Sequence, residues 1–178
     1  QQFDNPANPE YHRNTTGPEI IRDFAGRRLD YYVSGWGTGG TITGAGAILK
    51  TARPNIRVIA TEPEGAAMLS GADWAPHTIQ GWTPTLIPSV LDRKNIDEII
   101  LVTDDESIET AKALAMQEGI FCGISAGGTF AAALKVARRA DAGSSILAML
   151  PDTGERYLST PLFEGVKEGG DDELLEGL

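Results

Sequence analysis

The stretch LDYYVSGWGTGGT, residues 29–41, decides the fold class of this chain. Its first part, residues 29–34, is apolar and rich in β-formers, which predicts a buried strand. A glycine loop follows at residues 35–40, and the small residues of 43–52 predict a helix that Pro54 ends. Strand, glycine loop and helix in this order are typical of α/β proteins that bind an anion, because backbone N–H groups and the positive end of the helix meet at the loop.

The alternation of strand-like and helix-like segments continues on both sides of this stretch. Thr16-Gly17-Pro18-Glu19 has the spacing of a capping box, which predicts a helix from Thr16 to Phe24. Residues 62–88 show no regular period and predict a long irregular segment, which in compact domains is often functional. The other segments predict strands at 56–60, 99–102, 146–150 and near Phe121, and helices at 105–118 and 127–139. We therefore expect a three-layer α/β fold in which helices cover both faces of a mostly parallel, twisted sheet.

The composition narrows the class of protein. A chain of 178 residues with 41% hydrophobic and 22% charged residues is typical of one globular domain, which we place at residues 1–163 before an acidic, flexible tail at 164–178. The net charge of −10 and the scattered basic residues argue against nucleic-acid and anionic-membrane partners. The single cysteine, Cys122, excludes an intrachain disulfide, and no metal-ligand spacing occurs. Without a signal peptide or a membrane-spanning run, we expect a cytoplasmic protein.

The glycine loop has three interpretations from its residues alone. Gly35, Gly37 and Gly40 match the dinucleotide fingerprint, and Glu62 ends the next predicted strand, where a ribose-binding acid is expected. Thr38 and Thr41 instead favour a terminal phosphate dianion, because their hydroxyls add hydrogen-bond donors that a bridging pyrophosphate needs less. A tight turn without a ligand is the third interpretation. A nucleotide P-loop is excluded, since no lysine follows Gly40.

Several segments together resemble the cysteine synthases (O-acetylserine sulfhydrylases) and the related cystathionine β-synthases. The pentapeptide Gly37-Thr38-Gly39-Gly40-Thr41 resembles the phosphate cradle of these pyridoxal-phosphate enzymes. The other segments occur in the family's order: QQFDNPANP (1–9), PEGAAMLSG (63–71), HTIQGWTPTLIP (77–88), QEGIFCGISAGG (117–128) and PDTGERYLST (151–160). Trp36 departs from the family, where a smaller aliphatic residue is usual. The resemblance implies fold type II, the large-domain half of the tryptophan synthase β-like fold, with pyridoxal 5′-phosphate as cofactor.

The resemblance also implies roles for residues outside the glycine loop. Thr153 matches the hydroxyl residue that hydrogen-bonds the pyridine nitrogen, and a hydroxyl leaves the ring a weaker electron sink than a carboxylate would. Asp152 is the competing candidate by chemistry, since a carboxylate stabilises a pyridinium. Near the substrate the resemblance places Gln2 (or Gln1), Gly81, Gly123 and Ser125.

A hydrolase interpretation of Gly123-Ile124-Ser125-Ala126-Gly127 fails. This segment matches the nucleophile elbow GxSxG, which needs a histidine later in the chain. Both histidines, His12 and His77, come before Ser125.

The resemblance finally implies an incomplete enzyme. In the family, the lysine that binds the cofactor lies before the region that Gln1 begins, and the five lysines here lie in other contexts: Lys50, Lys94, Lys112, Lys135 and Lys167. We therefore expect the C-terminal part of a cysteine synthase that converts O-acetylserine and sulfide into cysteine and acetate, inactive on its own.

Three alternatives to this function stay open. They are a cystathionine β-synthase-like enzyme, an NAD-binding Rossmann domain and a non-catalytic binding module. The partners that the family resemblance implies are a second copy, in a homodimer, and the C-terminal tail of serine acetyltransferase.

Overall fold

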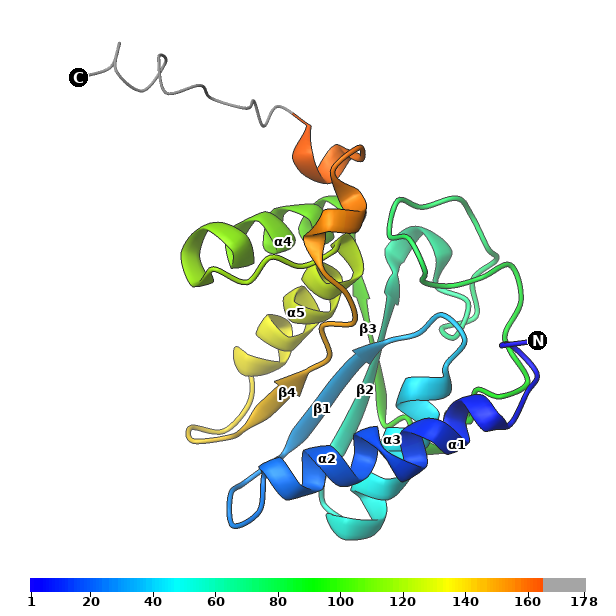
Figure 1. Ribbon diagram of the computed structural model, residues 1–178, viewed down its shortest axis with the longest axis vertical. Helices are drawn as coiled ribbons and strands as arrows, with labels where there is room; N and C mark the ends of the chain where they lie inside the picture. Colours follow the sequence, from blue (N-terminus) through cyan, green and yellow to red (C-terminus); the bar gives the residue numbers. More distant parts are fainter. Residues whose placement is uncertain (165–178) are drawn as a thin grey trace.

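A four-stranded parallel sheet forms the centre of the computed structural model, which describes residues 1–164 (Figure 1). The strands are β1 (Tyr31–Gly35), β2 (Arg57–Pro63), β3 (Glu98–Val102) and β4 (Ile146–Ala148), in the order β3-β2-β1-β4. The register sets Tyr31 opposite Arg57 and Ile146, and Ile59 opposite Glu98. The helices are α1 (Ala7–Asn14), α2 (Thr16–Asp23), α3 (Gly40–Ala52), α4 (Asp104–Glu118) and α5 (Ile124–Ala137), with short 3₁₀ turns at Glu64–Ala66, Arg93–Asn95, Gly154–Tyr157 and Pro161–Phe163.

Helices cover both faces of the sheet, so the expected three-layer α/β fold is confirmed (Figure 1). Successive side chains of a strand point to opposite faces. On β1, Val33 packs in a core with α4 and α5, whereas Tyr32 packs in a second core with α2 and α3. On β2, Ile59 packs in the core with α4 and α5, and Val58 packs in the core with α2 and α3. Both faces of the central strands are therefore buried, which explains their continuous apolar runs.

Helix α1 was not expected from the sequence, because the helix has no stripe of apolar residues to pack against the rest of the protein. Pro9 is its only buried residue, and the helix packs closely against glycines of α3. A Cβ on Gly44 would collide with the Pro9 carbonyl, and one on Gly40 would collide with the Asn8 side chain. Small residues on α3 therefore let α1 lie directly over the start of α3, next to the glycine loop.

The structure also corrects two local expectations. The capping box at Thr16 does not form: the residue before α2 is Thr15, and the Thr16 hydroxyl bonds His12 Nδ1 at 2.8 Å. Near Phe121 there is no strand, only an isolated antiparallel bridge between Cys122 and Thr153. The other predicted elements lie within three residues of their observed ends.

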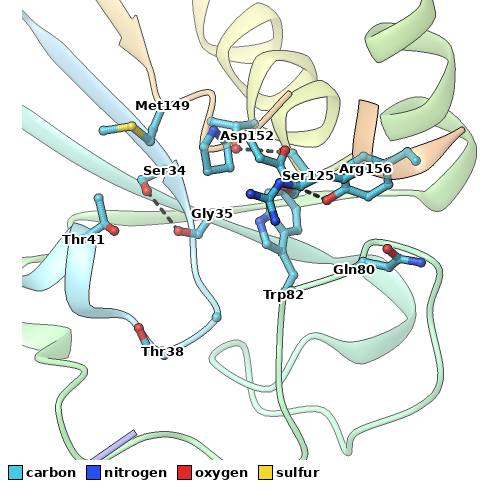
Figure 2. Close-up of a pocket in the computed structure, with 15 residues that line it drawn as sticks. Ser34, Gly35, Thr38, Thr41, Gln80, Trp82, Ser125, Met149, Asp152 and Arg156 are labelled. Carbon is cyan, nitrogen blue, oxygen red and sulfur yellow. Dashed lines mark hydrogen bonds between the residues drawn. The ribbon is translucent and has the colours of Figure 1, made fainter. Parts of the chain in front are cut away.

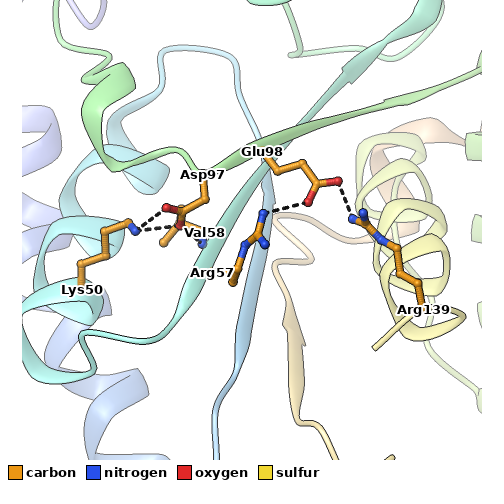
Figure 3. A network of polar contacts seen from close by, with 6 residues as sticks. All are labelled: Lys50, Arg57, Val58, Asp97, Glu98 and Arg139. Atoms are coloured by element: carbon orange, nitrogen blue, oxygen red, sulfur yellow. Dashed lines mark hydrogen bonds and ion pairs between the residues drawn. The ribbon is translucent and has the colours of Figure 1, made fainter. Parts of the chain in front are cut away.

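An ion-pair network joins both helical layers to the edge of the sheet where β3 begins (Figure 3). Asp97 pairs with Lys50 of α3 at 2.7 Å and accepts the Val58 N–H at 2.7 Å. Its neighbour Glu98 pairs with Arg57 of β2 and with Arg139, which follows α5. Within residues 1–164, no helix is long and apolar enough to cross a bilayer.

Candidate functional site

A cavity of about 530 Å³ lies at the carboxyl ends of β1 and β4, where open parallel sheets bind ligands. The glycine loop, the segment 80–82, the first turn of α5 and the segment after β4 enclose it (Figure 2). Its lining consists of Ser34, Gly35, Gly37, Thr38, Thr41, Gln80, Gly81, Trp82, Ser125, Thr129, Met149, Pro151, Asp152, Arg156 and Tyr157. Only one acid and one base belong to this set, Asp152 and Arg156, so most of its polar groups are hydroxyls and backbone amides.

Glycines of the loop are required by close approaches of the backbone. A Cβ on Gly37 would collide with the Gly81 carbonyl, so the glycine loop and the segment 80–82 touch through their main chains. Gly39 has φ of 80°, a left-handed conformation that favours glycine, and it directly precedes the first residue of α3. The N-terminus of α3 therefore follows the loop directly, as an anion site requires.

Both threonines of the loop line the cavity and are held from behind by α1. Thr38 Oγ1 accepts hydrogen bonds from Asn8 Nδ2 at 2.9 Å and from the Gly40 N–H at 3.2 Å. Thr41 Oγ1 lies 3.2 Å from His12 Nε2. Partial burial lowers the pKa of His12, which favours a neutral ring near pH 7.

The opposite wall of the cavity brings together Ser125, Asp152 and Trp82 (Figure 2). Tyr157 also lines the cavity and bonds Asp152. Ser125 lies in the first turn of α5 and is 3% exposed. The Tyr157 hydroxyl donates to Asp152 Oδ2 at 2.5 Å, while Asp152 Oδ1 is buried without a partner. Trp82 is 7% exposed, and a Cβ on Gly35 would collide with its indole ring, so that glycine makes room for this wall.

The structure separates the predicted site residues into two groups. Those that line the cavity are Gly37, Thr38, Thr41, Gly81 and Ser125, and Gly39 and Gly40 complete the backbone of the loop. Gly123 lies behind Asp152, because a Cβ there would collide with Asp152 Oδ1. Gln2 and Thr153 are exposed and outside the lining, where Thr153 pairs with Cys122.

Of the two candidates for the pyridine nitrogen, Asp152 lines the cavity and Thr153 does not, and the preference for Thr153 stays a prediction. Thr153 has an extended backbone, with φ of −103° and ψ of 158°. In an extended segment neighbouring side chains point to opposite sides, and here it is Asp152 that reaches the cavity.

Glu62 does not serve as a ribose-binding acid. The residue is fully buried, and its carboxylate accepts hydrogen bonds from the Leu69 N–H, the Ser70 N–H and hydroxyl, and Trp36 Nε1. These bonds occupy both oxygens, and Glu62 is absent from the cavity lining. The dinucleotide interpretation thus loses its acid, and the unusual Trp36 has a structural explanation as a donor to this carboxylate.

Three contributors to the site were not identified from the sequence as ligand contacts. Trp82 and Tyr157 form walls of the cavity, and His12 supports Thr41. The signal for Tyr157 was available, because it follows the last strand at the carboxyl edge. His12 carried no such signal, since its role depends on how α1 packs on α3.

These features define a class: an α/β domain with a glycine loop and a helix N-terminus beside a cavity, an arrangement that can bind an anion such as the phosphate of a cofactor. The sequence profile of the family described as "Pyridoxal-phosphate dependent enzyme" matches residues 1–152, and the chain belongs to that family. The expected membership of the cysteine synthase group and the pyridoxal-phosphate cofactor are thereby confirmed.

Three relatives illustrate the similarity. O-ureido-L-serine synthase of Streptomyces lavendulae is 57% identical over the whole chain and 55% of its own length, and its crystal structure superposes with a TM-score of 0.93 over 98% of this chain. A cysteine synthase of Staphylococcus aureus is 45% identical over 92% of this chain and 53% of its own length. The crystal structure of a cysteine synthase from Entamoeba histolytica has a TM-score of 0.89 at 38% identity, covering 99% of this chain and 52% of its own. The chain spans about half the length of the curated relatives that it matches.

Proposed function

We propose that the full-length protein catalyses β-replacement on an activated L-serine, with O-acetylserine and sulfide giving cysteine and acetate. One observation carries the proposal: a glycine loop with two threonine hydroxyls faces the buried Ser125 hydroxyl across one cavity. This arrangement offers a phosphate site at one end and a ring contact at the other. The family membership and the identity to cysteine synthases support the reaction class.

The residues of this chain bind and orient the cofactor. Backbone N–H groups of residues 37–39 and the positive end of α3 would hold the phosphate, and Thr38 and Thr41 would donate hydrogen bonds to it from their hydroxyls. When bound, pyridoxal phosphate supplies an electron-withdrawing ring that eases removal of the serine α-proton and departure of the β-substituent. Trp82 excludes water from one side of the cavity.

We assign the contact with the pyridine nitrogen to Ser125 in place of Thr153. Ser125 and Asp152 both line the cavity, but the Asp152 carboxylate is engaged by protein: Oδ2 accepts from Tyr157 and Oδ1 packs against Gly123. A hydroxyl partner can donate to an unprotonated nitrogen, so the ring remains a moderate electron sink. Such a ring suits elimination of a β-leaving group.

We propose the contacts with the amino-acid substrate on the basis of the family resemblance. Gly81 lines the cavity and can face the amino-acid substrate, and Gly123 supports Asp152 from behind. Ser125, which the resemblance also places near the substrate, is assigned here to the ring. Gln2 lies outside the lining, although its carbonyl accepts a hydrogen bond from Asn8, a neighbour of the cradle.

The lysine that binds the cofactor is proposed to come from a part of the protein outside this chain. None of the cavity-lining residues is a lysine. Lys50 pairs with Asp97, and Lys135 bonds Glu106 and the Leu101 carbonyl, so both are engaged elsewhere. Alone, the chain should bind pyridoxal phosphate reversibly, leave no borohydride-stable adduct and show no turnover. As a non-catalytic module it would behave in the same way.

A second candidate differs in the nucleophile. O-ureido-L-serine carries its ureido group on the β-oxygen, which corresponds to attack by the oxygen of hydroxyurea on the same serine carbon. The 57% identity to O-ureido-L-serine synthase over the whole chain favours this candidate. The third candidate is a cystathionine β-synthase-like enzyme, in which the thiol of homocysteine is the nucleophile.

The test is a competition in the full-length protein. Purified holoenzyme is given O-acetylserine with sulfide, hydroxyurea and homocysteine in separate reactions, and products are quantified by mass spectrometry. We expect cysteine to form with the highest kcat/KM. A higher value with hydroxyurea would establish the second candidate, and no product with any nucleophile would refute β-replacement. Titration with NAD, which should show no binding, serves as the control for the dinucleotide interpretation.

The remaining proposals follow the family. We propose a cytoplasmic homodimer whose active-site cleft accepts the C-terminal tail of serine acetyltransferase. Light scattering of the full-length protein measures the first property, and competition between the tail peptide and O-acetylserine measures the second.

A further inference from the structure

We infer that helix α1 fixes the hydroxyl protons of Thr38 and Thr41 so that both threonines act as donors into the cavity. The inference rests on the proposed use of the glycine loop as a phosphate cradle. It adds that Asn8 and His12, which do not touch the ligand, are positioning residues. They make the loop selective for a phosphate monoester dianion, whose oxygens all accept hydrogen bonds.

The contacts of the Thr38 hydroxyl determine the direction in which its proton can point. A hydroxyl has one proton and two lone pairs. Two N–H groups occupy the acceptor side of Thr38 Oγ1: Asn8 Nδ2 at 2.9 Å and the Gly40 amide at 3.2 Å. The proton of Thr38 therefore points away from both donors, and the cavity that Thr38 lines lies on its free side.

The orientation of the Asn8 amide is fixed by a second contact. Asn8 Nδ2 also donates to the Gln2 carbonyl at 2.8 Å. A flipped amide would set the Asn8 oxygen against that carbonyl oxygen and would leave two acceptors facing each other. Asn8 is also confined sterically, because its Oδ1 packs against Gly40, where a Cβ would collide with it. Asn8 is thus held as a donor to Thr38.

The geometry at Thr41 depends on the tautomer of His12. Its Nε2 lies 3.2 Å from Thr41 Oγ1, and its Nδ1 lies 2.8 Å from Thr16 Oγ1. If Nε2 carries the proton, Thr41 accepts from His12 and its own proton is free to enter the cavity. Nδ1 then accepts from the Thr16 hydroxyl, so every group has a partner. A bound dianion selects this tautomer, because the other one would turn the Thr41 proton toward His12.

The consequence is a preference among anions. Each of the two hydroxyls donates one hydrogen bond, which an unprotonated phosphate oxygen can accept. A phosphate oxygen that carries a proton or an ester group presents fewer acceptors at the same positions. The site should therefore hold a phosphate monoester dianion more tightly than a monoanion or a diester.

The main test compares two Asn→Asp variants in the full-length protein. Asn8→Asp replaces the Nδ2 donor by an oxygen that accepts the Thr38 proton, and so turns it out of the cavity. Loss of one hydrogen bond to a charged group corresponds to about a tenfold weaker affinity for pyridoxal phosphate. Pyridoxal, which lacks the phosphate, should bind as to the unmodified protein. Asn5→Asp is the control, because Asn5 Oδ1 accepts from the Ala7 N–H and an aspartate keeps that contact.

The outcomes separate the inference from the function on which it rests. Dissociation constants come from fluorescence titration, and the ³¹P chemical shift of the bound cofactor reports the protonation of its phosphate. If Thr38→Ala leaves the affinity for pyridoxal phosphate unchanged, the cradle assignment itself is wrong. If Thr38→Ala weakens binding while Asn8→Asp behaves like Asn5→Asp, the inference alone is wrong. The double variant Asn8→Asp/Thr38→Ala should be no weaker than Asn5→Asp/Thr38→Ala, which adds the same charge, because Asn8 acts through the Thr38 hydroxyl.

A second pair tests the same inference at Thr41 and covers the case in which Asn8→Asp does not fold. The His12→Gln side chain can donate to Thr41 Oγ1, whereas the isosteric His12→Glu side chain, when ionised, can only accept. We expect His12→Gln to bind pyridoxal phosphate at least about tenfold more tightly than His12→Glu, on the same hydrogen-bond energy. Equal affinities of these two variants would overturn the inference.

Discussion

The Tyr157 hydroxyl donates a 2.5 Å hydrogen bond to Asp152 Oδ2, and the other oxygen of Asp152 is buried without a partner. Burial raises the pKa of Tyr157, and the neighbouring Asp152 carboxylate raises it further, so Tyr157 stays protonated and remains a donor. Because Oδ1 packs against Gly123, the Asp152 carboxylate is held by the protein on both sides. The pair therefore shapes one wall of the cavity.

The first prediction concerns the stability of this wall. Tyr157→Phe removes the only hydrogen bond that the structure shows to the Asp152 carboxylate, and a buried acceptor left unpaired costs about 1–3 kcal/mol. We expect the free energy of unfolding of the full-length protein to fall by that amount in urea denaturation. In a background of Asp152→Ala the same change should cost much less, because the partner is already absent. Equal costs in both backgrounds would contradict the coupling.

The second prediction distinguishes the two hydroxyls considered for the pyridine nitrogen. Ser125→Ala should shift the absorption maximum of the bound cofactor and weaken its binding by about tenfold, the value of one hydrogen bond. Thr153→Ala should leave both properties unchanged, because Thr153 is exposed and outside the cavity. Absorbance spectra and fluorescence titration of the full-length protein make the comparison. A spectral shift in the Thr153 variant alone would restore the original assignment.

The fold was predictable where neighbouring residues in the sequence determine the structure. The run from Leu29 to Ser34, the glycines after it and the small residues of α3 specify strand, loop and helix by short-range patterns. Helix α1 escaped prediction because its packing depends on glycines far along the chain, such as Gly44, which admit it without an apolar stripe. Close backbone contacts between distant segments leave no periodic signal.

The site was predictable to the same extent. The cradle residues are contiguous, so their motif located them together. Asp152 and Thr153 are neighbours in an extended segment, so their side chains point to opposite sides and only one of them faces the cavity. The sequence contains no signal for which of the two side chains faces the cavity, since this depends on the bridge between Thr153 and Cys122. The wall formed by Trp82 likewise depends on tertiary packing, because Gly35 at the end of β1 makes room for its indole ring.

The third prediction tests the buried contacts of Glu62. Glu62→Gln replaces one carboxylate oxygen by an amide that must face N–H or hydroxyl donors, which leaves donors unpaired and costs about 1–3 kcal/mol of unfolding free energy. Ser70→Ala is the matched control, because it removes only the hydroxyl bond of an exposed residue. That control should cost less, because the backbone donors of Leu69 and Ser70 remain. An unchanged urea midpoint for Glu62→Gln, or NAD binding that Glu62→Gln abolishes, would contradict this structural role.

The last prediction is a dependence of stability on pH through Asp97 (Figure 3). Burial alone would raise the pKa of Asp97, but the ion pair with Lys50 and the Val58 N–H outweigh it and hold the pKa below the ordinary value of an aspartate. The folded state thus releases the Asp97 proton more readily than the unfolded state. Its contribution to stability is therefore fully present above about pH 4 and is lost as the pH falls through the lowered pKa.

Urea midpoints of the full-length protein measured between pH 7 and pH 3 test this dependence. Asp97→Asn keeps the size of the side chain and removes the charge. It should lower the free energy of unfolding by about 1 kcal/mol at pH 7, the value of one hydrogen-bonded contact. The difference from the unmodified protein should shrink toward pH 3, because protonation of Asp97 removes the same charge. Asp23→Asn, at an exposed position of α2, is the control and should follow the unmodified protein throughout. A difference between Asp97→Asn and the unmodified protein that stays constant down to pH 3 would show that the ion pair does not lower the pKa of Asp97.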